Sequence, residues 1–191
     1  SDRWADDPAL LAAEAMARGR ARGWRGVLAA HETAWRQDWD ASDVIIEGDD
    51  KVQEAVRFAV YHLTSAANPE DECVSVGARG LTGDAYFGHV FWDTEIYLLP
   101  FYIGVWPEAA RALLMYRYHT LHGARAKAAH FGFRGALYAW ESADTGEETT
   151  PERVIGADGT PVEILTGRME HHISADVAYA VWQYWRFTRD D

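Results

Sequence analysis

The stretch that decides the fold class is Pro107–Ala124, with the sequence PEAARALLMYRYHTLHGA. Proline suits a first helical position, because its φ angle is already helical and its missing N–H would have no partner there. Behind it, apolar side chains recur at three- and four-residue steps and share one face: Ala110, Leu113, Leu114, Tyr118, Leu121 and Ala124. This spacing predicts a single amphipathic helix through these residues.

The rest of the chain shows helical patterns without strand alternation. Residues 8–30 are rich in Ala, Arg, Leu and Glu, although three glycines weaken the pattern near the end. A second helix is predicted over 50–67 and a third over 94–105, kinked or interrupted by Pro100. A last helix is predicted over about 170–187. The chain is therefore expected to be all-α.

Two long loops separate these helices, over residues 70–93 and 130–170. Long ordered loops are usually functional. Within the second loop, Ala157–Thr160 has the sequence ADGT between two short apolar runs, which indicates one short β-hairpin.

Composition narrows the classes of partner. The 191 residues carry 18 basic and 30 acidic groups, a formal charge of −12, which argues against nucleic acid and anionic membranes. The single cysteine, Cys73, excludes an internal disulfide framework and permits a reducing compartment. The sequence shows neither a signal-peptide pattern nor an apolar run long enough to cross a bilayer. We expect a soluble, cytoplasmic protein.

The first candidate site lies in Gly88–Glu95, GHVFWDTE, where Trp92 precedes Asp93. An indole face can pack on the C–H face of a sugar ring, and a carboxylate can accept from its hydroxyls. The alternative is a helix start, in which Asp93 caps the following amides and Glu95 lies favourably against the helix dipole. The spacing alone leaves both open.

The same residue types recur in Trp140–Ser142, which precedes an acidic loop. Glycoside cleavage uses two carboxyl groups, so such a loop can contain a general acid or base. A solvated acidic loop is the favoured interpretation for three of its members: Asp144, Glu147 and Glu148.

The third candidate is Glu170-His171-His172 at a helix start. Adjacent histidines on a helix point in different directions, so joint metal ligation is poorly supported, and the His-Glu-x-x-His spacing is absent. We expect one histidine to face the loops and the other to pack, with no metal site. The phosphate-cradling glycine motifs and the Gly-x-Ser-x-Gly elbow are also absent, which disfavours nucleotide-dependent and serine-hydrolase chemistry.

Several segments together resemble glycoside hydrolase family 65, in order and with similar gaps over nearly the whole chain. They are Ile46–Asp49, Tyr61–Leu63, Gly77–Leu81, Gly88–Glu95, Tyr116–Tyr118, Trp140–Ser142 and His171–Asp176. The family contains inverting phosphorylases of maltose, trehalose, kojibiose and related α-glucosides, and acid trehalases.

The resemblance implies an incomplete (α/α)6 barrel. Residues 1–40 would form the helical linker that precedes the barrel, and residues 41–191 the first part of the catalytic domain. By the same resemblance, Trp92 and Asp93 would bind the glucosyl unit. The acceptor side would be lined by Trp140, Glu141 and Thr166, and the loop over 145–169 would correspond to a region that shapes the acceptor pocket.

The resemblance places no catalytic residue in this chain. The general acid is expected to be a Glu in a Gly-Pro-Asp-Glu-type loop downstream of Asp191, with the phosphate-binding residues further on. The 191-residue piece alone is therefore expected to be inactive.

The leading hypothesis is part of an inverting α-glucoside phosphorylase. It would take an α-linked glucose disaccharide and inorganic phosphate as co-substrates, need no cofactor, and form a homo-oligomer through exposed helix faces. The alternatives are an acid-trehalase-like hydrolase and a non-catalytic carbohydrate-binding helical module.

Overall fold

The computed structural model describes residues 7–83 and 85–190. Its backbone packing divides the chain into two units, Ser1–Asp43 and Val44–Asp191.

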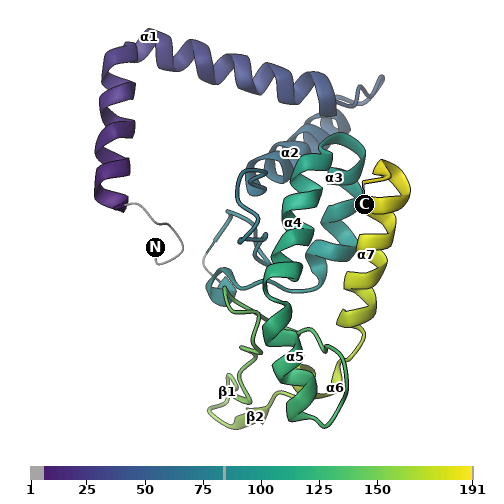
Figure 1. Cartoon of the computed structure of the whole chain (residues 1–191). Helices are drawn as coiled ribbons and strands as arrows, with labels where there is room; N and C mark the ends of the chain where they lie inside the picture. The colour runs from purple at the N-terminus through teal and green to yellow at the C-terminus, as the bar shows by residue number, and fades with distance from the viewer. Residues whose placement is uncertain (1–6, 84, 191) are drawn as a thin grey trace. The chain divides into compact units, whose positions relative to one another are not determined.

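The described part of the first unit is one long helix, α1 (Pro8–Ser42). The Asp7 side chain accepts a hydrogen bond from the Ala9 amide and caps the helix start. At Gly23 the backbone leaves helical geometry, with φ 67° and ψ 165°, and Figure 1 shows α1 bending sharply. Only glycine adopts such angles at little cost. The predicted helix over 8–30 was therefore too short, because helical backbone continues to Ser42, and Gly23 interrupts it with a kink.

The second unit begins with α2 (Asp50–Ala66), whose start is capped by Asp49 through the amides of Lys51 and Val52. A long loop follows, with one tight turn at Ala85–Gly88 in which Tyr86 and Phe87 take left-handed backbone angles. The next helical segment begins as a π-helical turn, η2 (Thr94–Leu98), and continues as α3 (Leu99–Val105). Pro100 lies in the first turn of α3, so the predicted interruption is confirmed.

The helix predicted over 107–124 is wrong in one respect: it is two helices, α4 (Pro107–His119) and α5 (Leu121–His130). Thr120 separates them, with φ −93° and ψ 7°. Its hydroxyl donates to the carbonyl of Tyr116 at 2.7 Å, beside the helical bond of 3.0 Å from its own amide to that carbonyl, and such side-chain bonds often bend helices. The break is thus encoded by a side chain that hydrophobic spacing does not register.

The core of this unit lies where α3, α4 and α7 (Ile173–Thr188) pack side by side, as Figure 1 shows. Small residues let the helices approach closely, and three of them are fully buried: Ala109, Ala110 and Ala180. Tyr102 is also fully buried, and its hydroxyl donates to the carbonyl of Leu63 at 2.6 Å, which ties α3 to α2.

The second long loop contains the predicted hairpin, formed by β1 (Arg153–Ile155) and β2 (Pro161–Glu163) in antiparallel register. Its turn is closed by Asp158, whose carboxylate accepts from the amide and the hydroxyl of Thr160. The short helix α6 (Thr166–Met169) follows before α7 begins. Across the two described stretches of chain, no helix has the length and apolarity needed to cross a membrane.

Candidate functional site

The two long loops meet at a pair of backbone hydrogen bonds. The Val90 amide donates to the Ser142 carbonyl at 2.9 Å, and the Ser142 amide returns a bond of 3.0 Å. This isolated antiparallel pairing joins residues that are 52 apart in sequence. It brings the two predicted tryptophan–carboxylate segments together.

Three rings gather beside this pairing, which we call the aromatic cluster: Trp92, Trp140 and His172. The two indole centroids lie 6.4 Å apart. The imidazole stands edge-on, with its centroid 4.9 Å from Trp92 and 6.1 Å from Trp140. Both indoles are half-buried, so part of each stays open to a ligand. The cluster offers the apolar, quadrupolar surface on which a sugar ring can pack.

His172 is held in place by two carboxylates. Its Nδ1 lies 2.5 Å from Asp176 Oδ2, and its Nε2 lies 3.1 Å from Glu170 Oε2. The ring of His171 instead lies beside Phe133, and its Nε2 is 3.0 Å from the Arg168 carbonyl.

The two histidines therefore point apart, as the sequence predicted. His172 was not among the predicted sugar-binding residues, and its position at a helix start beside a carboxylate was the available signal. In residues 7–83 and 85–190, no group of three His, Cys, Asp or Glu side chains is placed to hold a metal ion.

Asp93 is not the helix cap that one interpretation expected. It precedes η2, but its side chain makes no capping hydrogen bond. It lines instead a cavity of about 190 Å³, together with Arg79 and Phe91. A half-buried carboxylate at a cavity wall is able to accept hydroxyl groups from a ligand.

Glu95 lies in the first turn of η2, as the helix-start interpretation expected, but its side chain also has a partner in the core. The side chain is fully buried and receives two hydrogen bonds from Arg117, of 2.7 and 2.8 Å. Arg117 also donates to the Phe91 carbonyl at 3.0 Å, directly before Trp92. Burial opposes the charge of Arg117, but Glu95 outweighs this and raises the pKa of the guanidinium.

Glu141 is buried at 7% exposure and faces His89 rather than open solvent. Its Oε1 lies 2.7 Å from His89 Nδ1. The hydroxyl of Thr149 lies 3.3 Å from the same nitrogen and donates to the Glu141 carbonyl at 3.0 Å. His89 lies within the stretch singled out from the sequence, but nothing in the spacing indicated a partner beyond residue 140.

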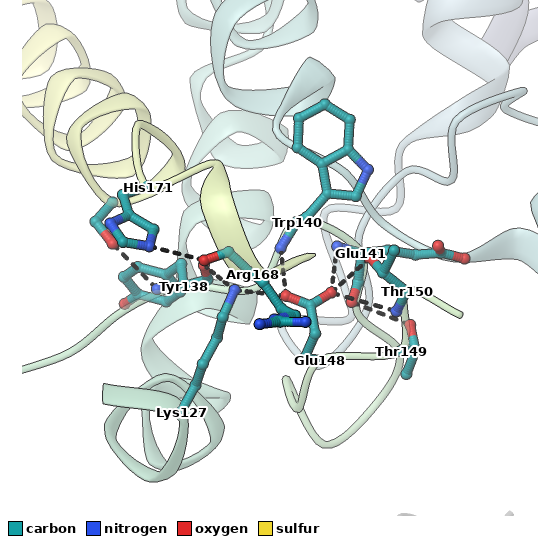
Figure 2. A network of polar contacts seen from close by, with 10 residues as sticks. Lys127, Tyr138, Trp140, Glu141, Glu148, Thr149, Thr150, Arg168 and His171 are labelled. Carbon is teal, nitrogen blue, oxygen red and sulfur yellow. Dashed lines mark hydrogen bonds and ion pairs between the residues drawn. The ribbon is translucent and has the colours of Figure 1, made fainter. Parts of the chain in front are cut away.

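The acidic loop divides into two kinds of residue. Asp144 and Glu147 are exposed, as predicted, but the interpretation of Glu148 as a solvated side chain is wrong. Figure 2 shows its carboxylate at the centre of a polar network. Burial opposes its ionisation, but hydrogen bonds from Lys127, Thr150 and the Trp140 amide outweigh this and lower the pKa of Glu148.

Thr166 opens α6 and is half-exposed. No ring contact or side-chain hydrogen bond of the described residues joins it to the aromatic cluster. Its neighbours Gly167 and Arg168 line a second cavity, of about 680 Å³, with Lys127 and Glu148. The structure therefore groups Trp92 with Trp140, and places Thr166 on the segment beside the larger cavity.

The structure thus places two tryptophans, each followed by a carboxylate residue, on the loops of a helical unit, and indole faces and carboxylates are groups that suit a sugar ring. The family model of the glycosyl hydrolase family 65 central catalytic domain matches residues 57–191. The chain belongs to this family.

Individual relatives agree with the family assignment. A kojibiose phosphorylase of Caldanaerobacter subterraneus subsp. tengcongensis is 54% identical over 88% of this chain and 22% of its own length. A kojibiose hydrolase of Flavobacterium johnsoniae is 43% identical over 86% of this chain and 22% of its own. The chain thus spans about a fifth of the length of the curated relatives it matches.

A solved structure named as a candidate kojibiose phosphorylase from the human microbiome superimposes on this chain with a TM-score of 0.82. The two are 27% identical, and the match covers 97% of this chain and 26% of that one. The fold is accordingly that of part of a helical barrel, as the sequence predicted.

Proposed function

We propose that this chain supplies the sugar-holding part of an inverting α-glucoside phosphorylase. In this proposal Trp92 and Asp93 bind the glucosyl unit whose bond is broken. The acceptor sugar contacts three residues: Trp140, Glu141 and Thr166. The complete protein converts an α-linked glucose disaccharide and inorganic phosphate into β-glucose 1-phosphate and a free sugar, in the cytoplasm and as a homo-oligomer.

The observation that carries the proposal is the aromatic cluster. It brings the Trp92 and Trp140 rings to 6.4 Å from each other and leaves both residues half-buried, and each is followed in sequence by a carboxylate residue, Asp93 and Glu141. Indole faces and carboxylate acceptors are the groups that hold a pyranose ring. The phosphorylase names of several relatives add the reaction class.

In the inverting scheme, a carboxylic acid protonates the glycosidic oxygen while a nucleophile attacks the opposite face of the anomeric carbon. The C–O bond to the leaving sugar breaks as the C–O bond to phosphate forms, and the proton ends on the leaving sugar. Phosphate is already anionic and needs no carboxylate base. The proposed roles of this chain are to orient the two sugars, while the general acid, a Glu downstream of Asp191, belongs to the complete protein.

The second candidate is hydrolysis by the same scaffold, with water as nucleophile. Relatives named kojibiose hydrolases, at 43% and 39% identity, favour it specifically. A non-catalytic carbohydrate-binding module remains the candidate from outside the enzymes.

The test is the phosphate dependence of sugar release by the full-length protein. Kojibiose, nigerose, maltose and trehalose are each incubated with and without inorganic phosphate, and released glucose and β-glucose 1-phosphate are quantified. Phosphate-dependent β-glucose 1-phosphate supports the proposal. Glucose release that is indifferent to phosphate rejects it in favour of the hydrolase, and binding without turnover rejects both.

A further inference from the structure

Glu148 and its neighbour Thr149 form hydrogen bonds with the backbone of Trp140 and Glu141. One carboxylate oxygen of Glu148 accepts from the Trp140 amide at 3.0 Å, and the other from the Glu141 amide at 3.2 Å. Thr149 adds two donors to the Glu141 carbonyl, its amide at 2.9 Å and its hydroxyl at 3.0 Å. The backbone of this dipeptide is therefore fixed by side chain and main chain of a neighbouring loop.

The carboxylate of Glu148 is itself anchored. Lys127 Nζ, which projects from α5 and is 7% exposed as a residue, lies 2.5 Å from one oxygen. The hydroxyl of Thr150 donates to the other oxygen at 2.6 Å. A charge-assisted bond at each oxygen limits rotation of the carboxylate, so the direction of its lone pairs is set by α5 and by the loop.

The side chains of Trp140 and Glu141 are the groups proposed to contact the acceptor sugar. Figure 2 shows the indole of Trp140 pointing away from Glu148. That indole contacts the aromatic cluster, and the Glu141 carboxylate pairs with His89. A small rotation of this backbone would displace both side chains together, because each is attached to a peptide that Glu148 holds.

We propose that Glu148, held by Lys127, is a positioning residue for the acceptor side of the sugar site. The inference rests on the proposed function, because the acceptor roles of Trp140 and Glu141 are part of that proposal. Glu148 acts through the backbone of those two residues and does not touch the substrate.

The test variant is Glu148→Gln, made in the full-length protein. The amide keeps one oxygen as acceptor and turns the other position into a donor, which opposes the backbone N–H that it faces. The matched control is Glu54→Gln, which removes the same charge from an exposed side chain on α2, outside the loop over 145–169. A double variant, Lys127→Met with Glu148→Gln, removes the unpaired buried cation that the single variant leaves behind.

Two readouts separate positioning from a general structural role. In the synthetic direction, we expect Glu148→Gln to raise the KM for the acceptor sugar about tenfold, the effect of losing one charge-assisted hydrogen bond, with the KM for β-glucose 1-phosphate within about twofold. Amide hydrogen exchange should become faster in a peptide that covers Trp140 and Glu141. The double variant should show the same KM and amide-exchange changes as the single variant, and Glu54→Gln should match the wild type in both readouts.

Equal changes in both KM values would overturn the inference, and so would an unchanged acceptor KM or unchanged amide exchange. If the wild type proves to be a hydrolase, the proposed function fails while this inference stays testable. The kcat/KM values of glucosides that differ only in the leaving sugar are then compared. An altered ranking in Glu148→Gln supports the inference, and an unaltered ranking overturns it.

Discussion

Arg117 and Glu95 form a two-point ion pair in the core, with both N–O distances below 3 Å and neither side chain more than 2% exposed. The pair lies directly under the segment that carries Trp92, because Arg117 also holds the Phe91 carbonyl. The helix α4 thereby sets the position of a loop residue that is proposed to bind sugar.

Breaking this pair should be strongly destabilising. Glu95→Gln leaves the guanidinium of Arg117 buried without its counter-charge, and such losses cost about 3–5 kcal/mol of unfolding free energy. Urea unfolding of the full-length protein measures the effect. Replacing both residues, Glu95→Leu with Arg117→Met, should recover part of the loss, and a double variant no better than the single one would contradict this account.

Removing one wall of the aromatic cluster should weaken sugar binding. Trp92→Leu keeps an apolar side chain but loses the flat indole face, and we expect kcat/KM to fall by about fivefold, since aromatic contacts are worth about 1 kcal/mol beyond area burial. The control is Trp24→Leu, at a tryptophan that is 76% exposed on α1. Steady-state kinetics that show equal losses in the two variants would argue against the subsite.

The adjacent residues His172 and His171 provide a test variant and its matched control. His172→Ala removes the ring that stands between the two indoles and two carboxylates, so kcat/KM should fall by about tenfold through loss of a hydrogen-bonded positioning group. His171→Ala, whose ring lies outside the cluster, should change kcat/KM by less than about twofold. The same loss in both variants would place the effect in the start of α7 rather than in the cluster.

The lowered pKa of Glu148 predicts that the folded protein loses stability in acid. Because its pKa is lowered in the folded protein, it adds stability that is fully present above its ordinary value of 4.5 and is lost as the pH falls through the lower folded value. The unfolding free energy of the wild type should therefore drop more between pH 5 and pH 3 (chosen to bracket about 4.5) than that of Glu148→Gln. Glu147→Gln serves as the control, and parallel acid limbs for wild type and Glu148→Gln would refute the prediction.

Two glycines with positive φ should respond differently to alanine. At Gly146, φ is 70° and an added Cβ would lie 2.4 Å from the Cβ of Thr120, at the break between α4 and α5. At Gly132, φ is 75° and nothing lies within 4 Å. Gly132→Ala should cost only the left-handed strain of about 1–2 kcal/mol, and Gly146→Ala clearly more. Thermal unfolding of the two variants provides the comparison, and equal shifts would exclude the close contact.

The sequence predicted a structural feature correctly where the physical cause of that feature lies within a few residues of it. Hydrophobic spacing identified α2 and α7, Pro100 marked the interruption before α3, and Ala157–Thr160 marked the hairpin. The same spacing missed the break at Thr120, because that break depends on a hydroxyl bond and on the close approach of Gly146 from a distant loop.

The sequence by itself determined the helical class, the order of the elements and, through several ordered motifs, the family. Only the tertiary structure decided what each carboxylate does. Glu95 became a core ion-pair partner and Glu148 a backbone anchor, while Asp93 remained at a cavity wall. The physical reason is that the energy of a charge depends on its burial and its partners, and these partners lie 22 residues from Glu95, on another helix, and 21 residues from Glu148.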